Sequence, residues 1–327
     1  MFTRNAVKID SENSISELLD VTIGGMRQWV YIRGLDKNKP VLLMLHGGPG
    51  SGQIGFVRKM QAELERHYIV VNWDQRGAGL SYSKQIPQET MNINQFVEDT
   101  LELTRYLCGR FGREQIYLLG HSWGTVIGML AIARSPQLYK RYFGVSQLAN
   151  YVEGEQLSYA ILLEKSRSQN NRKAYSDLSR IGPPPWSDLR HDRVHQKYLD
   201  SFGGGISHDG KMVGTIIKEL LKSKEYTLTD AFKHVKGQLF SMKHLQQELR
   251  EIDFKSRIHQ VEIPVHFCMG RHDLMIPYQQ SEEFFNLLKA PEKHWTWFEH
   301  SAHSPHFEER EKFASLIVEE TNKDGTF

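Results

Sequence analysis

Short, mostly apolar runs along the chain are separated by longer stretches in which apolar residues recur every three or four positions. The runs 41–45, 68–73 and 116–119 are too short for helices and rich in strand-forming residues, which predicts strands buried on both faces. Residues 95–109 carry apolar side chains at helical spacing, and so does the stretch after residue 124. This alternation of strand and helix predicts an α/β fold with a mostly parallel, doubly wound sheet.

Two segments depart from that alternation. Residues 15–34 alternate polar and apolar positions around Gly24-Gly25, which predicts a β-hairpin. Residues 150–253 are charged and helical in period, with glycine- and proline-rich breaks. Because strand–helix order returns after this segment, we expect a core of residues 1–149 and 254–327 with a helical cap, or lid, inserted at 150–253. A separate helical domain is the alternative.

Composition excludes several classes of protein. Of the 327 residues, 41 are Lys or Arg and 39 are Asp or Glu, a net charge of +2 that gives no case for a nucleic-acid partner. No apolar run reaches membrane-spanning length, and the first residues lack the apolar core of a signal peptide. Cys108 and Cys268 are expected to be reduced core residues. We therefore expect a cytoplasmic protein with no membrane partner, and the sequence leaves the oligomeric state open.

The sequence Gly120-His121-Ser122-Trp123-Gly124 joins a predicted strand to a predicted helix. This is the G-x-S-x-G pattern of a nucleophile elbow, in which a serine occupies a sharp turn. Its two glycines are expected where strand and helix pass too closely for side chains. A glycine-bounded turn with an ordinary capping serine is the alternative, so the pattern needs support from the rest of the chain.

An activated serine needs a base within hydrogen-bond reach and an acid that orients the base. Ser122, Asp273 and His303 occur in that order, and each follows a predicted strand, as in an α/β-hydrolase sheet. Other carboxylates and imidazoles near strand ends stay open as alternatives: Asp74, Asp253, His300 and His306. The histidines from 300 to 306 lack a helical i, i+4 pair, so we expect no metal site and no cofactor.

A glycine-rich segment, His46-Gly47-Gly48-Pro49-Gly50, follows the strand 41–45. Its backbone N–H groups, with that of Trp123, are expected to form an oxyanion hole beside the elbow. A simple glycine–proline turn is the alternative.

Together, these motifs resemble the prolyl iminopeptidase (proline aminopeptidase) family of α/β-hydrolases, serine peptidases of the S33 type. The similarity rests on His46–Gly50, Asp74-Gln75-Arg76-Gly77, the elbow and Gly270-Arg271-His272-Asp273. It implies that Ser122 is the nucleophile, Asp273 the acid and His303 the base. It also implies that Gly48 and Trp123 supply the amides of the oxyanion hole.

In this family the cap supplies glutamates that bind the free amine of the substrate, and here the candidates are Glu153, Glu155 and Glu248. The chain has His121 and His272 where the family often has Gly and Tyr. We predict a serine hydrolase that releases N-terminal proline, or another small residue, from short peptides. A carboxylesterase or small-amide hydrolase is the alternative, and a non-catalytic ligand-binding protein on the same fold is the third hypothesis.

Overall fold

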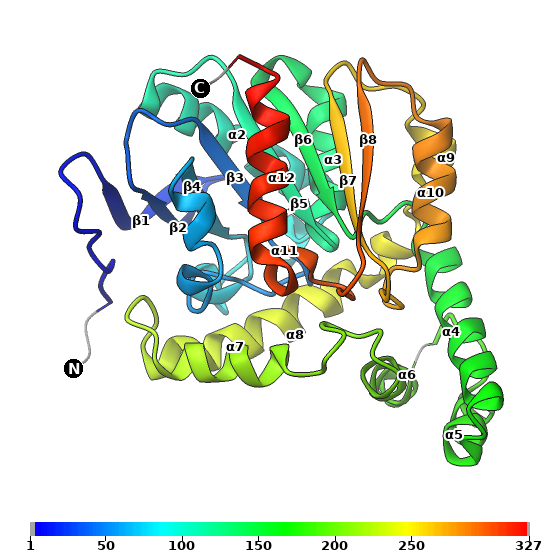
Figure 1. Ribbon diagram of the computed structural model, residues 1–327. Coiled ribbons are helices and arrows are strands. Elements are labelled where there is room, and N and C mark those ends of the chain that lie inside the picture. The colour runs from blue at the N-terminus through cyan, green and yellow to red at the C-terminus, as the bar shows by residue number, and fades with distance from the viewer. Residues whose placement is uncertain (1–3, 187, 326–327) are drawn as a thin grey trace.

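The computed structural model of the protein describes residues 4–186 and 188–325. Its centre is an eight-stranded sheet with the order β1-β2-β4-β3-β5-β6-β7-β8 (Figure 1). β1 and β2 form an antiparallel hairpin, β2 is antiparallel to β4, and all other pairs are parallel. The strands are β1 (Ile15–Ile23), β2 (Met26–Gly34), β3 (Val41–Leu45), β4 (Ile69–Asp74), β5 (Ile116–His121), β6 (Tyr139–Val145), β7 (Val265–Gly270) and β8 (Lys293–Phe298).

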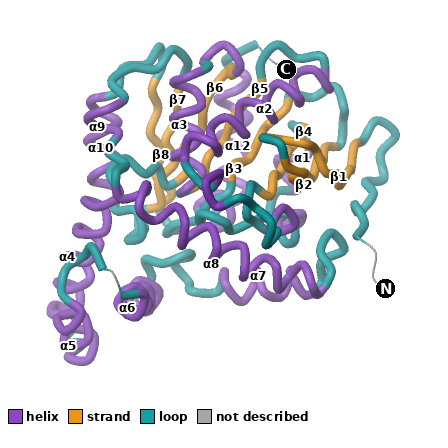
Figure 2. The backbone as a smooth tube through the Cα atoms, turned by 180° about the vertical axis from the view of Figure 1, so that it is seen from behind, coloured by secondary structure: helices purple, strands orange, loops and turns teal. Residues whose placement is uncertain are grey.

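Helices cover both faces of the sheet, because successive strand residues point to opposite sides (Figures 1 and 2). Leu43 and Leu118 pack into a core with α2 (Ile93–Phe111), α3 (Trp123–Arg134) and α10 (Tyr278–Leu287). Leu42 and Leu119 face the opposite core, with α1 (Ala62–Glu65) and α12 (Arg310–Asn322). The predicted α/β-hydrolase fold, a mostly parallel and doubly wound sheet, is confirmed.

Five helices lie between β6 and β7, in residues 150–253, here called the helical insertion (Figure 1). They are α4 (Tyr151–Ser168), α5 (Arg172–Ile181), α6 (Leu189–Ser201), α7 (Met212–Leu221) and α8 (Leu228–Arg250). The two ends of the insertion meet, since Asn150 and Asp253 form a β-bridge and the Phe254 N–H donates to the Ala149 carbonyl at 2.7 Å. That the insertion acts as a cap over the site stays a prediction.

Capping side chains explain where two of these elements begin. The Asn150 side chain accepts from the Glu153 N–H and starts α4, while Thr227 and Asp230 form a reciprocal capping box at the start of α8. The remaining short elements are α9 (Phe254–Arg257), α11 (Pro305–Glu308) and 3-10 turns at Val57–Lys59, Gly79–Ser81, Gln88–Thr90 and Pro136–Leu138. No helix in the described ranges is long and apolar enough to cross a bilayer.

Candidate active site

Ser122 occupies the sharp turn between β5 and α3. Its backbone has φ 53° and ψ −117°, a conformation that is strained for any residue with a side chain. A Cβ on Gly124 would come within 2.1 Å of the Leu45 carbonyl oxygen, and one on Gly120 within 2.5 Å of the Gly124 carbonyl oxygen. The expected close approach of strand and helix at both elbow glycines is therefore confirmed. No described residue accepts or donates a hydrogen bond at the Ser122 hydroxyl.

Asp273 and His303 are hydrogen-bonded to one another in the turns after β7 and β8. His303 Nδ1 lies 2.9 Å from Asp273 Oδ2, and both side chains are buried. The other carboxylate oxygen, Asp273 Oδ1, accepts from the N–H groups of Met275 and Ile276 at 2.9 Å each. These bonds fix the carboxylate with one oxygen directed at the imidazole, as the orienting acid of a serine–histidine pair requires.

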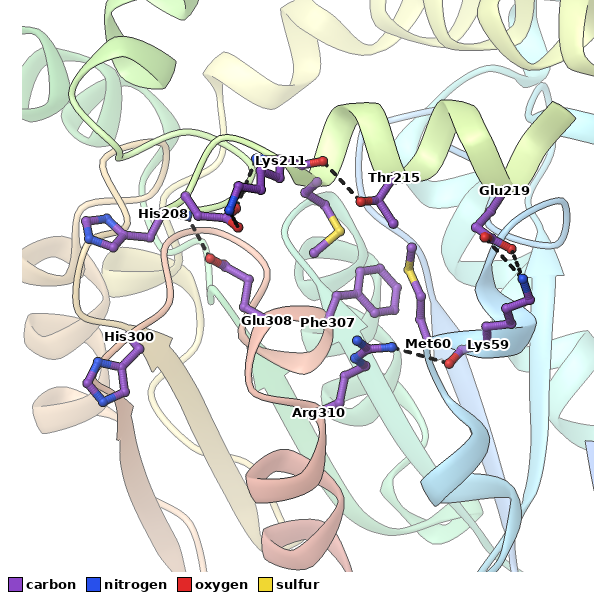
Figure 3. A pocket seen from close by; sticks show the side chains of 12 residues that line it. Lys59, Met60, His208, Lys211, Thr215, Glu219, His300, Phe307, Glu308 and Arg310 are labelled. Carbon is purple, nitrogen blue, oxygen red and sulfur yellow. Dashed lines mark hydrogen bonds and ion pairs between the residues drawn. The ribbon is translucent and has the colours of Figure 1, made fainter. Parts of the chain in front are cut away.

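The two alternative histidines lie elsewhere. His300 is exposed and lines a groove of about 410 Å³ between α7 and α11, and neither Asp273 nor Ser122 lines it (Figure 3). His306 lies in the first turn of α11, as expected, but its buried ring makes no recorded hydrogen bond among the described residues. Burial lowers the pKa of His306 to about 3, so its ring is neutral. His303 is thus the imidazole that pairs with Asp273.

The backbone around His303 is held from three sides. Its carbonyl oxygen accepts from Ser146 Oγ at 3.1 Å and contacts His121 Nε2 at 2.8 Å, and its N–H donates to the Gly205 carbonyl at 3.3 Å. Glu308 Oε1 accepts from the N–H groups on either side of it, at Ala302 and Ser304. The sequence analysis did not identify Glu308 as a residue that holds the turn of the candidate base, although it lies only five positions after His303.

A loop of the helical insertion, residues 203–208, connects the turns that carry Asp273 and His303. The Gly204 carbonyl accepts from the Leu274 N–H at 3.0 Å, and the Gly205 carbonyl binds the His303 N–H. The rings of His208 and His272 stack with centroids 3.7 Å apart. The loop with the glycine triplet 203–205 therefore packs against both turns.

Two backbone N–H groups beside the elbow, those of Gly48 and Trp123, make no hydrogen bond that the structure records with a described residue. Gln75 ties their segments together, since its Nε2 donates to the His46 carbonyl at 3.1 Å and its Oε1 accepts from the Trp123 indole at 2.9 Å. The Gln75 N–H also donates to His46 Nε2. Burial lowers the pKa of His46 to about 4, which leaves that nitrogen free to accept.

The carboxylates of Asp74 and Asp253, the alternative acids, have other partners. Asp74 is fully buried and accepts from the Tyr226 hydroxyl and from the Leu80 N–H, 2.9 Å away. Burial raises the pKa of Asp74 to about 6. Asp253 caps α9 through the Lys255 N–H. Arg76, the third residue of the Asp-Gln-Arg-Gly motif, forms a buried ion pair with Asp99 at 2.8 Å.

The three candidate glutamates of the insertion lie in different surroundings. Glu153 forms an ion pair with Lys255 at the surface, and Glu248 accepts from the Ile93 N–H at 2.7 Å, at the start of α2. The structure therefore assigns both of these side chains a structural partner. Glu155, by contrast, has a buried carboxylate oxygen with no hydrogen-bond partner.

Glu155 belongs to a cluster of charges inside the helical insertion. The pKa of Glu155 is raised to about 7, chiefly by burial, with a hydrogen bond from the Tyr151 hydroxyl lowering it, Asp192 raising it and Arg250 lowering it. The pKa of Asp192 is also raised, first by burial. Arg250 is the cation that both carboxyl groups face, and its Nε is buried without a partner. The cluster therefore holds two carboxyl groups whose pKa values are raised by burial near one guanidinium.

A possible metal-ligand cluster lies at the other end of the sheet, where Glu292, His294 and Glu320 come together. Arg141 donates to both carboxylates, and Lys323 donates to Glu320 at 2.6 Å. Because cations of the chain already neutralise these carboxylates, we interpret the cluster as an ion-pair network at the start of β8.

Comparisons with known proteins agree with this geometry. Residues 40–310 match the family model described as alpha/beta hydrolase fold. The chain is 38% identical over 311 residues to a probable aminopeptidase, YbaC, of Bacillus subtilis (strain 168), covering 94% of this chain and 97% of that protein. It is 29% identical to a proline iminopeptidase of Clostridioides difficile (strain 630), covering 88% and 91%. The crystal structure of proline iminopeptidase from Mycobacterium smegmatis aligns with a TM-score of 0.71 at 18% identity, covering 94% and 98%.

Proposed function

This chain belongs to the alpha/beta hydrolase fold family, and from that premise we propose that it is a serine hydrolase with Ser122 as nucleophile, His303 as base and Asp273 as acid. The observation that carries the proposal is the buried hydrogen bond of 2.9 Å between His303 and Asp273, in turns on the same sheet edge as the strained elbow. The unengaged Ser122 hydroxyl supports it, because serine–base hydrogen bonds are often long before substrate binds.

The chemistry follows from these contacts. Asp273 accepts a hydrogen bond from the Nδ1–H of His303 and stays ionised. This bond holds the tautomer in which Nε2 carries no proton, so that Nε2 takes the proton from the Ser122 hydroxyl as the oxygen attacks a carbonyl carbon. The N–H groups of Gly48 and Trp123 would then stabilise the negative oxygen of the tetrahedral intermediate. His303 returns the proton to the leaving group as the scissile bond breaks. A water molecule, activated by the same imidazole, hydrolyses the acyl-enzyme.

We infer that the substrate carries a free N-terminal amine, with proline or another small residue before the scissile bond. Relatives named as aminopeptidase and proline iminopeptidase support this specificity. The charge cluster of Glu155, Asp192 and Arg250 supports it independently. A cationic amine is costly to bury unless a carboxylate meets it, and this cluster has one carboxylate more than it has cations. Glu155 is our candidate for the amine ligand, and the carboxylate of Glu153 is already paired with Lys255.

We further propose that the helical insertion acts as a cap over this site. The support is the packing of α8 on the segments next to the candidate oxyanion hole. A Cβ on Gly50 would come within 2.8 Å of the Gln238 Cα, and Ser241 Oγ donates to the Gly77 carbonyl at 3.3 Å. A cap packed on these segments would limit access to the site.

The test compares Glu155→Gln with the matched control Glu153→Gln on two substrates, a prolyl arylamide and an aryl acetate. Loss of the charge at Glu155 should reduce kcat/KM for the arylamide by about a hundred-fold and leave the ester nearly unchanged. Glu153→Gln should leave both unchanged. Equal losses on both substrates, or no hydrolysis of any free-amine substrate, would favour the carboxylesterase instead.

A further inference from the structure

The helices α7 and α8 expose an unusual amount of apolar surface. Nine large hydrophobic side chains are recorded as exposed in the described chain, and seven of them lie on these two helices. They recur at helical spacing, so each helix presents an outward apolar stripe. We call the seven residues the hairpin face: Val213, Ile217, Leu221, Leu228, Phe232, Val235 and Leu239.

The opposite side of α7 is already packed against the core. Met212, Ile216 and Leu220 contact the cluster that contains Phe56 and Phe307. α7 is therefore apolar on its inner side and along much of its outer side. A helix with apolar residues on most of its circumference is normally covered on all sides. Figures 1 and 2 show α7 and α8 side by side along one outer edge of the molecule.

The exposed apolar area of the hairpin face is large enough to form an interface with another surface. Exposed fractions run from 44% at Val213 to 71% at Phe232. Together the seven side chains expose roughly 700 Å², about the area that one partner contributes to a stable protein–protein interface. Soluble monomers rarely expose an apolar patch larger than a few hundred Å². Area alone permits either a second copy of the chain or a lipid surface.

The charges around the hairpin face decide between these occupants. Six exposed lysines and three acidic residues lie between residues 210 and 246, and the exposed Asp209 just before that range lies 3.7 Å from the Nζ of Lys211. The three acidic residues there are each paired with a cation of the chain: Glu219 with Lys59, Glu225 with Arg58 and Asp230 with Arg4. The lysines are Lys211, Lys218, Lys222, Lys224, Lys236 and Lys243.

We propose that the hairpin face binds an anionic lipid surface as a peripheral membrane contact. Two copies facing each other would bring together more lysines than acidic residues, since Asp209 is the exposed acid paired with Lys211, whereas anionic headgroups would neutralise the lysines. An amphipathic helix with Lys beside Phe and Leu is the pattern of interfacial membrane binding. The sequence suggested no membrane partner because no apolar run reaches membrane-spanning length, whereas a peripheral contact needs only apolar side chains beside lysines on the folded surface.

The geometry links this contact to the candidate active site. α8 carries Phe232 and Leu239 outward, and it packs inward through Gly237 and Ser241 against Gly77. Lipid binding at the hairpin face would therefore bring α8, which packs beside the candidate active site as part of the proposed cap, to the bilayer surface.

The test is sedimentation of the full chain with vesicles of phosphatidylcholine, alone or with an equal part of phosphatidylglycerol. The protein should bind the mixed vesicles about tenfold more tightly than the neutral ones, and high salt should remove the difference. The double variant Phe232→Glu/Leu239→Glu should lose at least about tenfold in vesicle binding. The matched control is Leu287→Glu, which changes an exposed leucine on α10 and should bind like the native protein.

Melting temperatures will show whether the variants are folded, as expected for exposed positions. Absence of binding to the mixed vesicles, or equal binding by the double variant, overturns the proposal. Sedimentation equilibrium addresses the second copy: a dimer of the native chain that the double variant abolishes would assign the hairpin face to self-association instead.

Discussion

At the scale of one residue, Glu155, the proposed ligand of the substrate amine, is expected to lower the free energy of unfolding. Burial holds the pKa of its carboxyl group at about 7, well above its ordinary value of 4.5. At pH values between 4.5 and about 7, the folded state therefore keeps a proton on Glu155 that the unfolded state has released. Stability falls as the pH rises through this range and stays lower above it, since a buried carboxylate is then ionised.

Replacing Glu155 with Gln should consequently stabilise the protein at about pH 8 and give little gain at about pH 5, where the carboxyl group is still protonated when folded. Thermal unfolding of both proteins at the two pH values measures this. Glu153→Gln, a change at the surface, should show no such pH-dependent gain. A variant that is less stable than the native protein at the higher pH would contradict the proposed burial of charge.

Glu308 is one of the groups that hold the His303 turn. Its Oε1 accepts from the N–H groups of Ala302 and Ser304, and its Oε2 from the N–H of His208 at 2.7 Å. Glu308→Gln replaces one acceptor oxygen with a donor, so one of these attachments is lost. We expect kcat to fall about tenfold with little change in KM, because misplacement of the base affects chemistry more than binding. Steady-state kinetics, with the exposed Glu311→Gln as control, tests this; a change in KM alone would oppose it.

Sequence patterns revealed some of these residues and not others. Ser122, Asp273 and His303 could be expected at one sheet edge because each lies in the turn after a strand, and parallel strands bring their carboxyl ends to one edge. Glu153 and Glu155 could not be separated in advance. Two positions apart on a helix, they point in different directions, and only the packed insertion shows which direction is outward.

At the scale of elements, the loop 203–208 connects the insertion with both candidate catalytic turns. Its backbone carbonyls bind the turns that carry Asp273 and His303, so any displacement of the loop reaches both. Gly204 lies where a side chain does not fit, since a Cβ there would approach the Leu274 side chain to 2.3 Å.

Gly204→Ala should therefore destabilise the protein by about 1–3 kcal/mol, as overpacked sites do, and lower kcat by displacing the Asp273 turn. The control is Gly214→Ala inside α7, where a Cβ would meet nothing within 4 Å. That change should stabilise the helix by up to about 1 kcal/mol and leave kcat unchanged. Urea unfolding and kinetics measure both effects. Full activity in Gly204→Ala would show that the loop does not position the site.

Elements were predictable to different degrees. The strand at 41–45 was predicted with its observed ends because all five residues are buried and apolar. Packing and local backbone shorten two other helical segments. The segment before Arg66 forms only a 3-10 turn and the one-turn α1, since Phe56, Val57 and Met60 pack into a loop cluster. A non-helical Glu309 separates α11 from α12.

At the scale of the whole molecule, the helical insertion lies across the sheet edge that carries the candidate catalytic residues (Figure 1). A cap of this kind admits small substrates to the active site and excludes folded proteins. Short peptides with N-terminal proline should be cleaved, and a native protein incubated under the same conditions should remain intact on a denaturing gel. Efficient cleavage of internal bonds in the native protein would be incompatible with the proposed cap.

The central claim is that Ser122 is the nucleophile. It is tested most directly by intact-mass spectrometry after incubation with an active-site fluorophosphonate, followed by peptide mapping. The account predicts a single adduct on Ser122 in the native protein, a much slower reaction in His303→Ala, and no adduct in Ser122→Ala. An adduct on another residue, or undiminished labelling of Ser122→Ala, would contradict it.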